Sequence, residues 1–319
     1  MKKKMACLLV MTMLLTGCSS NDTDVLTYEP SFDSSIAVAS VDSEELFASN
    51  LCVVSETDLD KSDSVMTSSA SLIFNRTKNE IVYANNIYER LYPASITKIV
   101  TALVALKEGN VSDEIEISHT ASHITEVGAK LCGFNEGDKV SFTTLLNSLL
   151  IYSGNDAGIA MAEYIAGSEE KFSERMNEEV RKLGATHSHF VNSHGLHDEN
   201  HYTTAYDIYL IFNELLNYDE FKAIIDQGSY KAEYTNASGQ QVAKIFPNTN
   251  QYLIGATNAP EDVTVLGGKT GTTNAAGSCL VLLSTDENGD EYISLVLNAA
   301  SKADLYNQMN HLLDMIHSK

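Results

Sequence analysis

Residues 279–299 read CLVLLSTDENGDEYISLVLNA. Two apolar runs, at 279–284 and 292–299, flank the polar turn DENGD at 286–290. This order predicts an antiparallel hairpin, because the runs have strand length and the segment between them is rich in turn-forming residues. A further strand is indicated just upstream by VTVLG at 263–267. The C-terminal part of the chain therefore predicts an antiparallel sheet.

The other end of the folded chain carries a similar signal. ASLIF (70–74) and EIVYA (80–84) flank the polar segment NRTKN (75–79), which predicts a second hairpin. Between the two ends and after the last strand, apolar residues recur at helical spacing. Helices are predicted at 96–107, 142–151, 155–166, 169–183, 203–217 and 302–317. We therefore expect an α+β fold, in which one antiparallel sheet from both chain ends is flanked by helices and an all-helical lobe is inserted.

Composition narrows the class of protein. The chain has 319 residues, of which 43 are Asp or Glu and 21 are Lys or Arg, so its formal net charge is −22. Nucleic acid is excluded as a main partner, because binding to phosphates needs clustered basic residues. No apolar run reaches the roughly 18 residues of a membrane-spanning helix.

The N-terminus resembles an export signal. A basic start, MKKK, precedes an apolar stretch at 5–15, and LTGC at 15–18 looks like a bacterial lipobox. We expect a lipoprotein signal peptide at 1–17, lipidation of Cys18, an acidic Ser/Thr-rich tether at 18–47 and one folded domain at 48–319. The protein would then be exported and held by lipid at the extracytoplasmic face of a membrane. An ordinary signal peptide that happens to contain Cys18 is the alternative.

No CxxC motif is formed by the three further cysteines, which are Cys52, Cys132 and Cys279. A disulfide framework or a zinc knuckle is therefore disfavoured. We expect three unreactive, partly buried thiols, and a single disulfide stays open.

The first candidate for chemistry is SITK at 95–98. Ser95 and Lys98 are three residues apart, so on a helix they share one face. A serine hydroxyl becomes nucleophilic when a neighbouring base takes its proton. A lysine serves as that base when burial and nearby positive charge lower its pKa. Taken alone, the pattern is more often a helix cap followed by an exposed lysine.

Two more short motifs follow. SGN at 153–155 lies at a break between predicted helices, and GGKTGTT at 267–273 lies on or just after a predicted strand. A phosphate-binding P-loop would need glycine at position 263, where this chain has Val263, and no helix pattern follows the motif. The three motifs, in this order, are the signature of penicillin-binding proteins and serine β-lactamases.

Together these residues resemble the low-molecular-mass penicillin-binding proteins, specifically the serine-type D-alanyl-D-alanine carboxypeptidases of the peptidase S11 family, which includes penicillin-binding protein 5. The similarity extends beyond the motifs. It covers PASITKIVTALVAL (93–106), SGNDAGIAMAEYIAG (153–167), HFVNSHGLHDENHYTTAYD (189–207) and GGKTGTTNAAGSCLVL (267–282).

The resemblance implies an acyl-enzyme on Ser95, formed with a peptidoglycan stem peptide that ends in D-Ala-D-Ala, and inhibition by β-lactams. Lys98 would be the base, Ser153 would relay the proton, and Asn155 would hold the substrate. The implied substrate-binding residues are Lys269, Thr270, Gly271 and Thr272. Convergence of Lys98 and Lys269 would lower the pKa of Lys98.

The resemblance implies no cofactor. Thr272 replaces a histidine that some members of the family carry after K-T-G. Family members often add a β-rich domain and a C-terminal amphipathic anchor, and we expect the lipid at Cys18 to serve as the anchor here.

Other functions stay open on the same fold. A class A-like β-lactamase needs a deacylating glutamate in an E-x-x-x-N motif, which 180–203 lacks. A DD-transpeptidase or endopeptidase would use the same acyl-enzyme, and a non-catalytic penicillin sensor would only bind. A zinc enzyme must also be weighed because of His187, His189, His194, His197 and His201, with Asp198 or Glu199 as further ligands. A surface loop is the simpler explanation of this segment, which contains no H-E-x-x-H.

Overall fold

The computed structural model describes residues 63–317. The predicted signal peptide, Cys18, the tether at 18–47 and Cys52 lie outside these residues. Within 63–317, no helix has both the length and the apolar character needed to cross a membrane.

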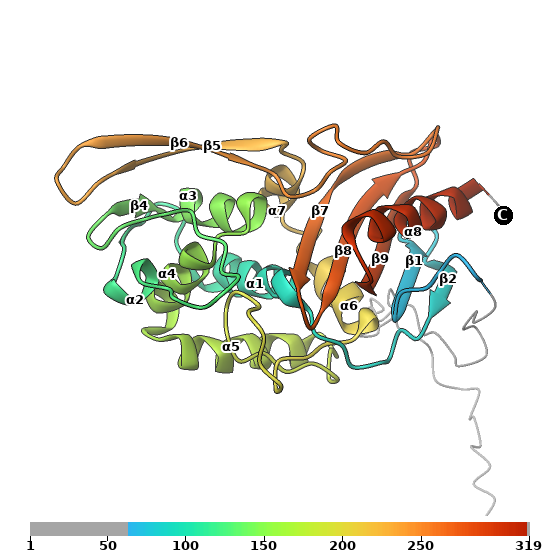
Figure 1. Ribbon diagram of the computed structural model, residues 1–319, viewed down its shortest axis with the longest axis horizontal. Coiled ribbons are helices and arrows are strands. Elements are labelled where there is room, and N and C mark those ends of the chain that lie inside the picture. Colours follow the sequence, from blue (N-terminus) through green and yellow to red (C-terminus); the bar gives the residue numbers. More distant parts are fainter. Residues whose placement is uncertain (1–62, 318–319) are drawn as a thin grey trace, which may run out of the picture. The chain divides into compact units, whose positions relative to one another are not determined.

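A five-stranded antiparallel sheet joins the two ends of the described chain, as predicted (Figure 1). The N-terminal hairpin pairs through β1 with β9, so the strand order is β2-β1-β9-β8-β7. The strands are β1 (Ala70–Asn75), β2 (Glu80–Asn85), β7 (Thr264–Thr273), β8 (Gly277–Thr285) and β9 (Glu291–Ala299).

Helices cover both faces of this sheet. Successive strand residues point to opposite faces, so Leu282 packs in one apolar cluster with Met309 of α8, whereas Val281 packs in another with residues of α1 and α6. Both clusters consist of almost fully buried side chains. The sheet is therefore the middle layer between α8 and the helices of the lobe (Figure 1).

The helices largely match the predicted ranges, and several begin at a capping side chain. Ser168, Thr204 and Ser301 each accept a hydrogen bond from the backbone N–H three residues later. The helices are η2 (Ala94–Thr97), α1 (Lys98–Glu108), α2 (His119–Ser122), α3 (Phe142–Asn147), η3 (Ser148–Tyr152), α4 (Asn155–Ala166), α5 (Glu169–Lys182), α6 (Ala205–Leu215), α7 (Asp219–Ile225), α8 (Lys302–Asp314) and η4 (Met315–His317).

Contrary to expectation, the lobe is not all-helical, because it also contains a small second sheet. Its order is β3-β4-β5-β6, and the β5–β6 hairpin forms its longest part (Figure 1). In β5, buried Ala232 and Tyr234 alternate with exposed residues, a strand pattern without a continuous apolar run. The strands are β3 (Glu114–Glu116), β4 (Lys139–Ser141), β5 (Ser229–Thr235) and β6 (Gln241–Pro247).

Candidate active site

Ser95 lies in the short 3-10 turn η2, directly before α1. The predicted helix at 96–107 thus begins as a tighter turn, and its regular part starts at Lys98. Ala94 has a positive φ of 47°, which is unusual for a residue other than glycine. This bend places the Ser95 Oγ 3.0 Å from the Nζ of Lys98.

The ammonium of Lys98 is fully buried at the start of α1. It donates hydrogen bonds to Ser95 Oγ at 3.0 Å, Asn155 Oδ1 at 2.8 Å and the His194 carbonyl at 2.6 Å. All three acceptors are uncharged. The nitrogen is therefore held in place without a directly bonded carboxylate.

Burial lowers the pKa of Lys98 to about 7, and the charge of Lys130 acts in the same direction. Asp156 and Glu169 act in the opposite direction. Of the two predicted causes, burial is the larger, and the nearby positive charge is that of Lys130 and not of Lys269. An amine with this pKa is neutral in part of the population near pH 7 and can accept a proton from the adjacent hydroxyl.

Ser153 follows a π-helical turn, η3, and itself has a positive φ of 71°. The wide turn and the left-handed residue end the helix, and Ser153 lines the pocket. The Nζ of Lys269 donates to Ser153 Oγ at 3.0 Å and to the Thr270 carbonyl at 2.9 Å. Burial, followed by the charges of Lys98 and Lys130, lowers the pKa of Lys269 well below its ordinary value.

The K-T-G motif lies inside strand β7, because this strand continues from the predicted 263–267 to Thr273. Gly271 faces η2 at very short range. A Cβ at this position would lie 3.0 Å from the backbone nitrogens of Ser95 and Ile96 and 2.9 Å from the carbonyl of Pro93. Only a residue without a side chain lets the strand edge approach Ser95 this closely.

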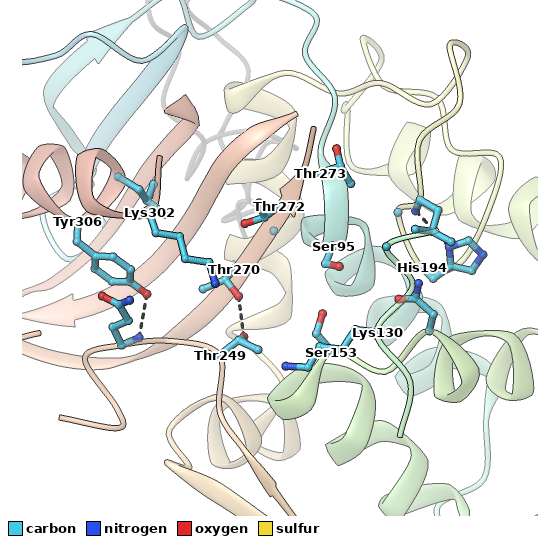
Figure 2. Close-up of a pocket in the computed structure, with 17 residues that line it drawn as sticks. Ser95, Lys130, Ser153, His194, Thr249, Thr270, Thr272, Thr273, Lys302 and Tyr306 are labelled. Atoms are coloured by element: carbon cyan, nitrogen blue, oxygen red, sulfur yellow. Dashed lines mark hydrogen bonds between the residues drawn. The ribbon is translucent and has the colours of Figure 1, made fainter. Parts of the chain in front are cut away.

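These residues meet around a pocket of about 220 Å³ (Figure 2). Ser95, Ser153, Thr270 and Thr272 line it together, and Thr270 donates to the hydroxyl of Thr249 at 2.6 Å. Lys98 and Lys269 lie directly behind this wall, each bonded to one of the two serines. The structure thus gathers the site residues of all three motifs.

Two lysines of the pocket were not identified from the sequence. Lys130 comes from the segment that precedes β4, and Lys302 comes from the first turn of α8. Neither belongs to a motif, so no local signal marked them. Among the described residues that line the pocket there is no Asp or Glu.

Asp156 fixes the segment that carries Lys130. This buried carboxylate accepts the backbone N–H groups of Cys132 at 2.9 Å and Gly133 at 2.8 Å. The backbone N–H of Asn155 in turn donates to the Lys130 carbonyl at 2.7 Å. The start of α4 and the Lys130 segment are therefore joined at the edge of the pocket.

The histidine-rich segment is partly buried, which corrects the expectation of a surface loop. His201 is 2% exposed, and its Nδ1 accepts the N–H of Val191 at 3.1 Å, so its Nε2 carries the proton toward Thr97 Oγ1 at 2.7 Å. Burial lowers the pKa of both His194 and His201 to about 3. In the described part of the chain, the five histidines that were weighed as zinc ligands do not come together as a group.

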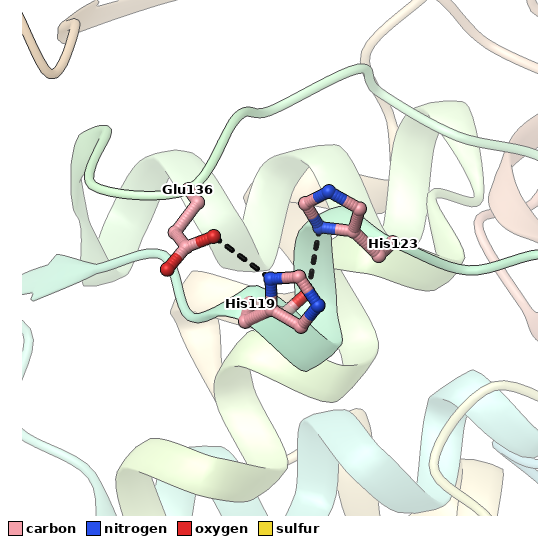
Figure 3. A group of neighbouring side chains, drawn as sticks. All are labelled: His119, His123 and Glu136. Atoms are coloured by element: carbon pink, nitrogen blue, oxygen red, sulfur yellow. Dashed lines mark hydrogen bonds and ion pairs between the residues drawn. The ribbon is translucent and has the colours of Figure 1, made fainter.

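A different set of side chains could hold a metal ion. His119, His123 and Glu136 lie together on the surface, and His119 Nδ1 is 2.8 Å from Glu136 Oε2 (Figure 3). Their ligand atoms all fall within 4.8 Å of one another. None of the three lines the pocket.

Cys132 and Cys279 are free and buried. Burial raises the pKa of Cys132 well above its ordinary value and that of Cys279 to about 11. Both thiols are therefore protonated and unreactive near neutral pH, as predicted for these two positions.

The peptidase S11 family model, described as D-alanyl-D-alanine carboxypeptidase, matches residues 57–301. The chain belongs to this family. Among curated S11 relatives, DacF of Bacillus subtilis is 31% identical over 78% of this chain and 62% of its own length. DacC of Escherichia coli is 33% identical over 76% of this chain and 60% of its own length. Both are named D-alanyl-D-alanine carboxypeptidases, and the chain spans about 60% of their lengths.

Solved structures show the same S11 fold. A variant of the Streptomyces K15 DD-transpeptidase matches with a TM-score of 0.74 at 23% identity, over 80% of this chain and 99% of that one. The D-alanyl-D-alanine carboxypeptidase DacD from Francisella tularensis matches with a TM-score of 0.70 at 25% identity. This match covers 84% of this chain and 74% of the DacD chain. The mixed fold of helices and antiparallel sheet is thus that of DD-peptidases.

Replacement of Asp156 tests the link between α4 and the Lys130 segment. Asp156→Ala leaves the N–H of buried Cys132 without its acceptor, which costs about 1–3 kcal/mol, and also removes the acceptor of the Gly133 N–H. We expect a loss of unfolding free energy of that order in urea denaturation, together with faster amide exchange at residues 130–134. Asp198→Ala, at an exposed position, is the matched control. Unchanged stability and exchange in Asp156→Ala would show that the carboxylate does not hold this segment.

Proposed function

We propose that this S11 protein is a serine D-alanyl-D-alanine carboxypeptidase, which removes the terminal D-alanine from peptidoglycan stem peptides through an acyl-enzyme on Ser95. One observation carries the proposal. The Nζ of Lys98 lies 3.0 Å from Ser95 Oγ, and burial lowers the pKa of this lysine to about 7. A hydroxyl and a weakly basic amine at this distance form an activated nucleophile.

In the first step, neutral Lys98 takes the proton of Ser95 as Oγ attacks the carbonyl carbon between the last two D-alanines. Negative charge then develops on the carbonyl oxygen. The backbone N–H groups of Ser95 and Thr272 are the proposed donors to this oxygen. Gly271 supports this role, because it lets β7 run beside the backbone of Ser95.

In the second step, Ser153 passes a proton to the nitrogen of the departing D-alanine as the C–N bond breaks, and Ser153 in turn receives the proton that Lys98 took from Ser95. Its hydroxyl is bonded to the ammonium of Lys269 at 3.0 Å, which orients it and stabilises a transient alkoxide. Asn155, bonded to Lys98 at 2.8 Å, is positioned to hold the substrate amide. Water then hydrolyses the ester on Ser95 and regenerates the free enzyme.

The terminal carboxylate of the substrate is proposed to bind along β7. The hydroxyls of Thr270 and Thr272 line the pocket there, with the charge of Lys269 behind them. Figure 2 shows Lys302 reaching from α8 toward Thr270, so a further cation is available to the same carboxylate. The same contacts suit the carboxylate of a β-lactam, and we propose β-lactams as covalent inhibitors of Ser95.

The alternative functions differ from a carboxypeptidase in how the acyl-enzyme on Ser95 is formed or broken down. A class A-like β-lactamase would need a carboxylate to activate water, and among the described residues none lines the pocket. Glu169 is half-buried, and its oxygens are bonded to the hydroxyl and the N–H of Ser193. A DD-transpeptidase or endopeptidase would use the same residues with a different acceptor or donor peptide. A penicillin sensor would bind β-lactams without releasing D-alanine, and the intact Ser95–Lys98 pair argues against a decayed site.

Replacement of Ser95 tests the function directly. We expect the wild-type domain, residues 48–319, to release free D-alanine from a pentapeptide ending in D-Ala-D-Ala and to be labelled covalently by a fluorescent penicillin. Ser95→Ala should lose both signals by at least a thousandfold while circular dichroism stays native. Labelling that persists in Ser95→Ala would reject the assignment. Formation of an amide with an added amine, in place of free D-alanine, would identify a transpeptidase.

The pH dependence of acylation tests the role of Lys98. Because only the neutral amine accepts the proton, the rate constant of penicillin labelling should fall about tenfold per pH unit below 7 and level off above it. Stopped-flow measurements between pH 5 and 9 would give this profile, with circular dichroism as a check on folding. Lys98→Met should abolish labelling. A rate constant that still rises tenfold per unit up to pH 9 would contradict a pKa of about 7 for Lys98.

We also propose that the protein is exported and anchored by lipid on Cys18. The lipobox-like motif LTGC at 15–18 supports this proposal. Expressed at full length in a bacterium, the wild type should incorporate an alkyne fatty acid and sediment with membranes. Cys18→Ala should do neither, and Cys52→Ala is the control that should keep both. Equal incorporation in Cys18→Ala would contradict lipidation at this position.

A further inference from the structure

The pocket is cationic although the chain as a whole is strongly acidic. The formal charge of the protein is −22, yet Lys130 and Lys302 line the pocket and no Asp or Glu does so among the described residues. Catalysis as proposed above uses Lys98 and Lys269, which lie behind the two serines. The catalytic steps proposed above leave Lys130 without a role.

Lys130 is held in position by the same turn that carries the S-G-N motif. Its carbonyl accepts the N–H of Asn155 at 2.7 Å, and its ammonium lies 4.0 Å from the centre of the Tyr152 ring. Shortly after Lys130, the backbone N–H groups of Cys132 and Gly133 are fixed by Asp156. Backbone and side chain are thus both restrained, so little entropy is lost when a ligand binds to the ammonium.

No carboxylate neutralises this ammonium. Within residues 63–317, Lys130 forms no ion pair, and its ammonium lies over the ring of Tyr152 instead. Burial and the charge of Lys302 lower its pKa, and its own charge lowers the pKa of Lys98 and Lys269. Cations placed this close repel one another until an anion joins them.

We propose that Lys130 binds a second anionic group of the substrate, a carboxylate other than the terminal one. This inference rests on the proposed function. The terminal carboxylate is assigned to β7, with Thr270 and Thr272, whereas Lys130 lines the pocket from a segment bonded to the S-G-N motif. The substrate class is therefore a stem peptide whose residue before D-Ala-D-Ala carries a free side-chain carboxylate, as a diamino dicarboxylic acid does.

We expect Lys130 to distinguish a charged carboxylate on the substrate from a neutral group of the same shape. Lys130 is half-buried, so a carboxylate paired with it is partly removed from water and interacts more strongly than a surface pair. A carboxamide of the same shape accepts a hydrogen bond but brings no charge. We expect about a tenfold preference for the free carboxylate, which decreases as ionic strength rises.

The test uses two peptides ending in D-Ala-D-Ala that differ only in the preceding diaminopimelic acid, whose side-chain carboxylate is free in one and amidated in the other. The measurement is kcat/KM for release of D-alanine by the wild type and by Lys130→Met and Lys130→Arg. We expect the ratio of the two rates to be about ten in the wild type, near one in Lys130→Met, and largely restored in Lys130→Arg. Lys139→Met, at an exposed position on β4, is the matched control and should keep the wild-type ratio.

Each other outcome overturns the proposal in a recognisable way. Equal rates on the two peptides in the wild type would show that no second carboxylate is recognised. A parallel fall of both rates in Lys130→Met, with the ratio intact, would show that the charge acts only on the catalytic lysines. If the wild type releases D-alanine from neither peptide, the proposed carboxypeptidase function itself fails, and the inference fails with it.

Discussion

The buried nitrogen of Lys98 needs hydrogen-bond acceptors, and it finds them on three separate segments of the chain. Ser95 comes from η2, Asn155 from the start of α4, and the carbonyl of His194 from the segment before α6. A buried amine without hydrogen-bond partners would have a high free energy. Burial of Lys98 therefore requires that these three segments lie close together. The same burial lowers the pKa of Lys98, so one constraint serves both the fold and the proposed chemistry.

Close approach of backbones is the second requirement of the site. Gly271 brings β7 against η2, and Gly195, with a φ of 86°, lies where a Cβ would come within 1.9 Å of the Ala94 carbonyl. Ala94 and Ser153 adopt positive φ values themselves. Strain of this kind persists only where the surrounding contacts determine the backbone, as the buried hydrogen bonds of this site do.

Electrostatics gives the pocket a character opposite to that of the whole chain. An acidic protein would repel an anionic peptide at long range, whereas the lysines of the pocket attract it at short range. Lys98 and Lys269 belong to the S-x-x-K and K-T-G motifs of the sequence. Lys130 belongs to no motif, and its place in the pocket is what suggests a preference within the family's substrates.

The sequence alone determined the α+β class, the sheet built from both chain ends, and the positions of the three motifs, since these depend on local periodicity and short patterns. It did not reveal the β5–β6 hairpin, whose exposed strands lack a continuous apolar run. It also did not identify Lys130 and Lys302 as residues of the pocket. These features depend on contacts between segments that are distant in the sequence, and such contacts form only in the tertiary structure.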